Sequence, residues 1–98
     1  MRIISFSKLK EFFSKDANAR VGLQDWYKRA KKYEWNEFFD VKKTFNSADN
    51  VGNDRYVFYI KGNHYRVVAI IIFKLKTLFI RWVGHHKDYD KLKDINKL

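Results

Sequence analysis

Apolar residues in the first half of the chain recur at intervals of three and four, the spacing of one face of an α-helix. In a helix that begins at about Phe6, this stripe consists of Leu9, Phe12 and Phe13. A second helix is predicted from about Arg20 to Tyr33, and a third, shorter one follows Asn36. The stripe of the second helix contains Leu23, Trp26, Tyr27 and Ala30.

The period changes to two from Arg55 onward, which is typical of β-strands. Three strands are predicted, over residues 55–60, 65–73 and 78–83. Gly62-Asn63 is expected to form a two-residue hairpin turn, because both residues tolerate positive φ. The segment from Lys74 to Thr77 is expected to turn the chain again, whereas the polar segment 46–54 predicts a loop.

This order of elements predicts an α+β fold in which N-terminal helices pack on an antiparallel β-sheet. The sheet is expected to be a three-strand meander, and residues 2–5 offer an additional N-terminal strand. A chain of 98 residues is expected to form one domain that spans residues 1–98.

The chain is strongly basic, with 21 Lys and Arg residues against 11 Asp and Glu, a formal net charge of +10. Both halves share the excess, so the charge belongs to the whole domain and not to a tail. Such a surface attracts polyanions, of which nucleic acid is the commonest. An anionic membrane surface or an acidic protein partner would fit the charge equally well.

The chain contains no cysteine, which excludes disulfides, thiol catalysis and cysteine-based zinc sites. The longest apolar run, Val67 to Phe73, is far shorter than the roughly 20 residues of a membrane-spanning helix. The N-terminal residues do not resemble a signal peptide, because charged residues follow them at once. We therefore expect a soluble, cytoplasmic protein.

The densest group of reactive side chains comes directly after the last predicted strand. It consists of His85, His86, Lys87, Asp88, Tyr89 and Asp90. Histidine is the side chain whose unperturbed pKa lies nearest neutrality, and it serves in proton transfer for that reason. In a basic protein, such a group is a candidate for chemistry on a phosphate.

Hairpin geometry adds basic residues at the same end of the sheet. If the second predicted turn is right, Arg66 pairs near Gly84, and the first hairpin brings it close to Tyr59 and Lys61. Arginine can hold phosphate oxygens through two parallel hydrogen bonds. The face of Arg81 depends on the strand register, which the sequence does not determine.

Each candidate also has a purely structural interpretation. Strand arginines are often salt-bridge partners, a tyrosine at a sheet end often packs against the sheet, and a lysine beside a turn is usually a solvated charge. The two histidines with Asp88 and Asp90 match no strong metal-ligand spacing. We expect no metal and no other cofactor, because RNA can supply its own 2′-hydroxyl as the nucleophile.

A set of segments, in order along the chain, resembles the HigB-type toxins of bacterial type II toxin–antitoxin systems. The most specific are the G-N-x-Y-R-hydrophobic block at residues 62–67 and the H-K-x-Y-D segment at residues 86–90. The resemblance runs from about residue 2 to 92. Its shorter segments are Ser5–Leu9, Asp25–Tyr27, Asp40–Lys42, Phe45 with Ser47–Asp49, and Ile80-Arg81.

The resemblance implies a small RelE-like fold and an endoribonuclease that halts translation by cutting mRNA, often on the ribosome. It also implies a cognate HigA-like antitoxin protein. The family's arginine after G-N-x-Y falls on Arg66, and its terminal motif falls on His86, Lys87, Tyr89 and Asp90. The position before the family histidine is commonly threonine and here is His85, so either histidine is a candidate for the active one.

We therefore predict a metal-independent mRNA endoribonuclease toxin. The predicted catalytic residues are Arg66, His86, Tyr89 and Asp90. The predicted RNA-binding residues are Lys61, Arg81, His85 and Lys87. The alternative is a non-catalytic basic domain that blocks RNA, the ribosome or gyrase, since some proteins of this fold poison gyrase and a fold alone does not determine activity.

Overall fold

The computed structural model describes all 98 residues and contains helices, short 3₁₀ turns and one β-sheet. The helices are α1 (Phe6–Lys15), α2 (Arg20–Lys32), α3 (Phe38–Thr44) and α4 (His86–Asp90). The strands are β1 (Arg2–Ile4), β2 (Asp49–Gly52), β3 (Arg55–Ile60), β4 (Tyr65–Ile72) and β5 (Thr77–His85). The 3₁₀ turns are η1 (Ala17–Ala19), η2 (Phe73–Leu75) and η3 (Ile95–Lys97).

The five strands form a single mixed sheet in the order β1-β5-β4-β3-β2. Neighbours from β2 to β5 are antiparallel, whereas β1 pairs with β5 in parallel. The predicted α+β fold, the three-strand meander and the additional N-terminal strand are all confirmed. Strand β4 lies at the centre of the sheet and is the most apolar strand, as expected of an element covered on both faces.

Two local predictions were wrong. The segment 46–54 is not only a loop, because Asp49–Gly52 forms β2 at the sheet edge, paired with β3. Its residues are polar because an edge strand is half solvated, so the apolar pattern of a strand is absent. The first hairpin turn has four residues, since Ile60 pairs with Tyr65, and its positive φ values fall on Lys61 and Gly62.

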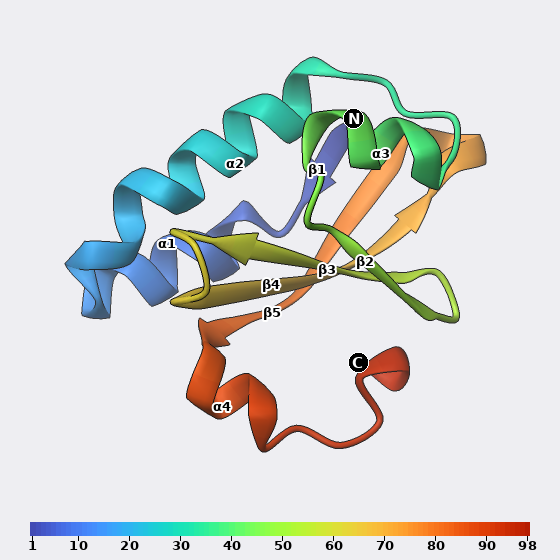
Figure 1. Cartoon of the computed structure of the whole chain (residues 1–98). Helices are drawn as coiled ribbons and strands as arrows, with labels where there is room; N and C mark the ends of the chain where they lie inside the picture. The colour runs from blue at the N-terminus through green and yellow to red at the C-terminus, as the bar shows by residue number, and fades with distance from the viewer.

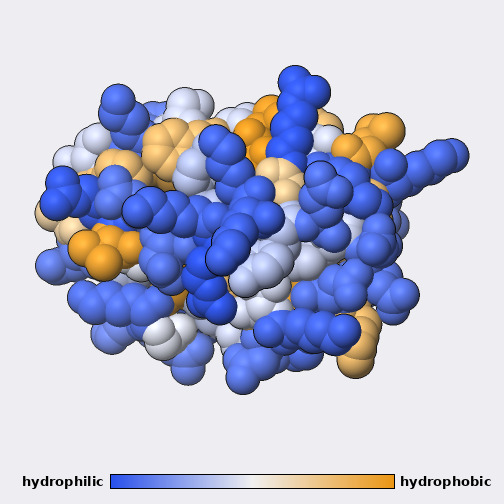
Figure 2. Space-filling view, turned by 90° about the horizontal axis from the view of Figure 1, so that it is seen from above, coloured by the Kyte–Doolittle hydropathy of each residue, from blue (hydrophilic) through white to orange (hydrophobic).

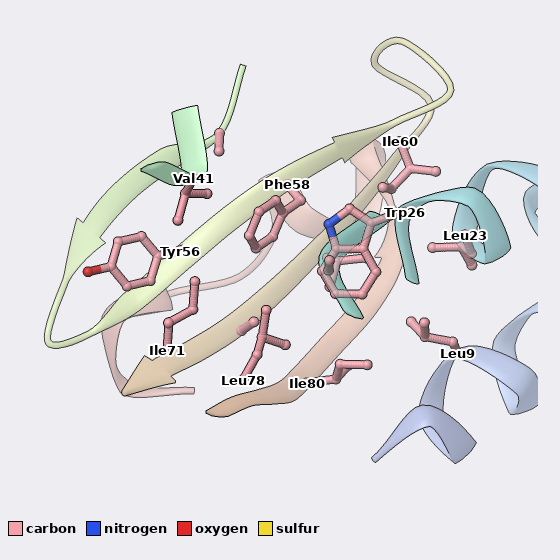
Figure 3. Close-up of a cluster of buried hydrophobic side chains, with 14 of the residues drawn as sticks. Leu9, Leu23, Trp26, Val41, Tyr56, Phe58, Ile60, Ile71, Leu78 and Ile80 are labelled. Carbon is pink, nitrogen blue, oxygen red and sulfur yellow. The ribbon is translucent and has the colours of Figure 1, made fainter. Parts of the chain in front are cut away.

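The main core lies between the sheet and helices α1 to α3, and α4 with the C-terminal segment lies on the opposite side of the sheet (Figure 1). Helices α1 and α2 bury the predicted residues Leu9, Leu23 and Trp26. These side chains belong to the same buried hydrophobic cluster as the strand residues labelled in Figure 3. Val57 and Val68 are buried on the other face, against which the C-terminal segment packs. The sheet is therefore a middle layer.

A β-bulge interrupts the pairing of β4 and β5, where Val68 pairs with Trp82 but Ala69 pairs with Ile80. Arg81 is the extra residue. An extra residue reverses the side-chain alternation beyond it, so the sequence period of two does not run through β5. This bulge determines which face each residue near the end of β5 occupies.

The side of the molecule seen over the helices is mostly hydrophilic, with apolar side chains in separate spots (Figure 2). The large apolar residues that are well exposed are Val21, Tyr33, Phe39 and Leu75. No helix combines the length and the apolar character that crossing a membrane would require.

Candidate active site at the end of the sheet

Arg66 lies near the start of β4, and its guanidinium contacts two tyrosine rings. The guanidinium carbon is 4.3 Å from the ring centre of Tyr59 and 5.5 Å from that of Tyr89. Nη1 donates to the carbonyl oxygen of Asn63 over 2.8 Å. Nε is buried and has no hydrogen-bond partner in the protein. Both rings are close enough for cation–π contacts with the guanidinium.

Strand register explains why these groups meet. Tyr59 is paired with Arg66 across the β3–β4 hairpin, and Gly84 of β5 is paired with Arg66 on the other side. A Cβ at Gly84 would come within 2.6 Å of the Trp82 ring, so glycine lets this ring lie against the strand. The Trp82 ring centre is in turn 6.1 Å from that of Tyr89, which positions α4 beside Arg66.

Both tyrosines are held in the neutral form. Burial and a hydrogen bond to the carboxylate of Asp49 raise the pKa of Tyr59 to about 12. Burial also raises the pKa of Tyr89, while the Arg66 guanidinium acts in the opposite direction. Tyr89 therefore keeps a proton at neutral pH, and its neighbour Arg66 can lower the cost of releasing it.

His85, the last residue of β5, lies on the helix side of the sheet. Its Nε2 is 2.7 Å from Oδ2 of Asp16, which follows α1, and the hydroxyl of Tyr65 donates to Oδ1 of the same carboxylate over 3.1 Å. The ring packs against Phe12 and Tyr65, with centre distances of 5.8 Å and 4.9 Å. Burial, followed by the bond to Asp16, raises the pKa of Tyr65.

His86 begins α4, and its backbone N–H donates to the carbonyl oxygen of His64 over 3.0 Å. All three histidines of the chain lie around one open cavity of about 560 Å³ at this end of the sheet. The cavity is lined by His64, His85, His86, Lys87, Asp88 and Lys91. Its lining contains no apolar residue and is rich in groups that can bind an anion or move a proton.

The other predicted site residues, Lys61, Asp90 and Arg81, lie outside the cavity that the three histidines line. Lys61 is exposed in the four-residue turn and lines a smaller cavity, of about 180 Å³, together with Tyr59. Asp90 is exposed at the end of α4, where its charge contributes to the raised pKa of Tyr89. Arg81 lines a separate cavity of about 280 Å³ beside α1, with Lys8 and Lys15 among its neighbours.

The structure thus brings Arg66 together with Tyr89, and groups His85, His86 and Lys87 around the adjacent cavity. Sequence reasoning missed Asp49, Asp16 and His64 as members of the site. Hairpin pairing could have pointed to His64, which directly precedes Tyr65, but no local pattern connects Asp16 with His85. The side chains form no group of three or more potential metal ligands.

Comparison with known proteins agrees with the family resemblance seen in the sequence. Residues 19–92 match the family described as HigB_toxin, the RelE-like toxic component of a toxin–antitoxin system. The chain is 32% identical, over 94% of its length and 91% of the relative's, to the protein named mRNA interferase HigB from Escherichia coli O6:H1. It is 42% identical to the mRNA interferase toxin HigB of Escherichia coli K12 over 52 residues, about half of each chain.

Proposed function

This chain belongs to the HigB toxin family, the RelE-like toxic component of a toxin–antitoxin system, and we propose that it acts by cutting mRNA. The relatives named mRNA interferase support this activity. The observation in the molecule that carries it is the Arg66 guanidinium, which contacts the rings of Tyr59 and Tyr89 and makes one hydrogen bond within the protein, to Asn63. A guanidinium with further donors left free is suited to an anionic ligand.

The ligand that fits is a phosphodiester of RNA. A guanidinium binds phosphate oxygens with directed hydrogen bonds, and it stabilises the negative charge that grows on them in the transition state. Lys61 in the β3–β4 turn and Lys87 on α4 add positive charge at the same end of the sheet, and the whole chain has a net charge of +10. Arg81 lies in a separate cavity and is assigned to the RNA flanking the cut.

Proton transfer is assigned to groups next to Arg66. His86 and Tyr89 both lie on α4 and are the acid–base candidates, and the charge of Asp90 helps to keep Tyr89 protonated by raising its pKa. The 2′-hydroxyl of the RNA serves as the nucleophile, so the reaction needs no metal. Cleavage that continues undiminished in the presence of a chelator would agree with this assignment.

The toxin family implies an antitoxin partner, and we propose a HigA-like protein encoded beside this chain. We also propose that cutting takes place on translating ribosomes, in the cytoplasm. Expression with and without the neighbouring gene tests the first point. Comparison of free mRNA with ribosome-bound mRNA as the substrate tests the second.

The decisive experiment is to induce the chain from a tight promoter and to map new mRNA 5′ ends. We expect growth arrest with discrete cuts. Arg66→Ala should abolish both, and Arg66→Lys should also be strongly impaired, because an ammonium lacks the planar fork that binds two phosphate oxygens at once. Arg20→Ala, an exposed change at the start of α2, is the matched control and should stay fully toxic.

Two outcomes would contradict the proposal. Arrest with intact mRNA would point to a non-catalytic inhibitor of the ribosome or of a DNA enzyme. Full toxicity of folded Arg66→Ala would remove Arg66 from the site. Circular dichroism and thermal unfolding of the purified variants show whether the fold is kept.

A further inference from the structure

The contact between His85 and Asp16 has no role in the site as assigned above. Tyr65 is almost completely buried, and its hydroxyl donates to the same carboxylate, so Asp16 is held from two sides. The side chain of Asp16 is only 20% exposed, whereas that of His85 is 47% exposed. A fixed, mostly covered carboxylate thus orients an imidazole that is open to solvent.

The contact with Asp16 determines which nitrogen of a neutral His85 ring carries the hydrogen. An ionised carboxylate only accepts hydrogen bonds, so Nε2 of His85 carries the proton that is donated to Asp16. Nδ1 makes no hydrogen bond within the protein. In the neutral ring, Nδ1 is therefore the basic nitrogen, and Asp16 stabilises the imidazolium that forms when Nδ1 accepts a proton. This is the relation between carboxylate and histidine in hydrolytic triads.

The position of His85 connects this pair with the proposed phosphate site. His85 lines the cavity of about 560 Å³ together with His64, His86 and Lys87. Because Tyr65 pairs with His85 and Arg66 with Gly84, the side chains of His85 and Arg66 leave the sheet on opposite faces. Helix α4 links them at the end of the sheet, since it carries His86 and Lys87 at the cavity and Tyr89 against Arg66. A cavity of this volume lies in the range of roughly 300–1,000 Å³ that small-ligand sites occupy, and so has room for a nucleotide.

We propose that His85, held by Asp16, accepts the proton of the ribose 2′-hydroxyl, and that His86 donates a proton to the leaving 5′-oxygen. This proposal rests on the proposed ribonuclease function and gives the two adjacent histidines different roles. It adds Asp16 as a positioning residue, supported by Tyr65.

The step balances without a further reactant. As Nδ1 of His85 takes the proton, the 2′-oxygen forms a bond to phosphorus and the bond between phosphorus and the 5′-oxygen breaks. His86 protonates the departing oxygen. The products carry a 2′,3′-cyclic phosphate and a 5′-hydroxyl, and transfer of a proton between the histidines and water restores the starting state.

The test measures the single-turnover rate of cutting, with enzyme in excess over a short mRNA bound to purified ribosomes, together with the affinity of each variant for that complex. His85→Ala should lower the rate by roughly 10²–10⁴-fold, the usual contribution of an acid–base group. Asp16→Asn should lower it by at least about tenfold, because an amide keeps the bond to Tyr65 but cannot stabilise an imidazolium. Affinity should stay unchanged in both.

Asp54→Asn is the matched control, since it makes the same chemical change in the exposed turn before β3, at the opposite end of the sheet from His85. It should cut at the wild-type rate. His85→Gln is a second variant, which keeps a polar side chain against Asp16 if His85→Ala unfolds. Thermal unfolding confirms that each variant retains its fold.

The outcomes separate the two proposals. Wild-type rates in folded His85→Ala, His85→Gln and Asp16→Asn would overturn the role of His85 while leaving the nuclease intact. Products with a 5′-phosphate would overturn the 2′-hydroxyl step for both histidines. A wild-type chain that cuts no RNA, free or on ribosomes, would instead reject the proposed function itself.

Discussion

The tyrosine beneath Arg66 is fixed by a residue outside the predicted site. The hydroxyl of Tyr59 donates to Asp49 on the edge strand β2, and its ring then supports the guanidinium of Arg66. Tyr59 therefore links the edge strand β2 to Arg66 on the central strand β4. Its phenol stays protonated at physiological pH, because its pKa is about 12.

Tyr59 should make the free energy of unfolding depend on pH in the alkaline range. Folding raises the pKa of Tyr59 from 10.0 to about 12, so the folded state holds a proton that the unfolded state releases. The stabilisation is complete below pH 10 and is lost as the pH rises from 10 to about 12. Tyr59→Phe keeps the ring but removes the titration. Its free energy of unfolding should fall less steeply over this interval, in urea titrations at several pH values.

The other tyrosines and the lysines titrate in both proteins, so their contribution cancels in the comparison. Parallel curves for the wild type and Tyr59→Phe would contradict the assigned cause. The difference between them isolates the hydroxyl that donates to Asp49.

At this scale, the sequence predicted contacts that follow from strand pairing. Arg66 does lie beside Tyr59, because this relation depends on where the β3–β4 hairpin turns. It also pairs with Gly84, a relation that depends on the β4–β5 turn together with the bulge at Arg81. The contact of Asp16 with His85 could not be predicted in this way. It depends on how α1 packs over β5, which no local spacing determines.

At the scale of elements, the close approach of α2 to β3 depends on one glycine. A Cβ at Gly22 would lie 2.8 Å from Cγ2 of Ile60, a β-branched side chain that is buried in the core. The core at this point therefore has no room for even one methyl group. The distance between helix and strand is set by this absence of a side chain.

Gly22→Ala should therefore destabilise the fold although alanine is the better helix former. Helix propensity favours the change by about 1 kcal/mol, whereas overpacking a core costs about 1–3 kcal/mol. We expect a net loss of about 1 kcal/mol of unfolding free energy in urea denaturation. Val21→Ala, at the neighbouring exposed position, is the control and should not be destabilised. A more stable Gly22→Ala protein would show that Ile60 moves aside freely.

Helices and strands were predicted correctly where burial of one face gives the apolar residues a regular spacing, and they were missed where it does not. Helices α1 and α2 and strands β3 to β5 each bury one or both faces, and their residues show it. Strand β2 is a polar edge, and the bulge at Arg81 depends on the pairing of two strands. Both are consequences of the assembled sheet, and so have no signal of their own in the sequence.

For the molecule as a whole, the net charge of +10 should make RNA binding strongly dependent on salt. Lys87 and Lys91 line the three-histidine cavity. If both contact phosphates, the double change to Gln should reduce the slope of log affinity against log salt by about 1.4 for single-stranded RNA. Fluorescence anisotropy with a short RNA at several salt concentrations measures this slope.

Lys10→Gln with Lys74→Gln is the matched control, because it removes the same charge from exposed positions away from the cavity. Its slope should stay close to that of the wild type. Equal reductions in both double variants would mean that RNA responds to the overall charge and not to this cavity.

The parallel pairing of β1 with β5 has a consequence for folding during synthesis. Residues 2–4 are synthesised well before their partners at residues 77–79, and Asp16 meets His85 later still. Contacts so distant along the chain form late, because the intervening segment must first be available to fold back. A nascent chain that ends before residue 77 therefore lacks β5 and has no assembled site. The proposed site for cutting mRNA can therefore assemble only after residues 85–90 have been synthesised.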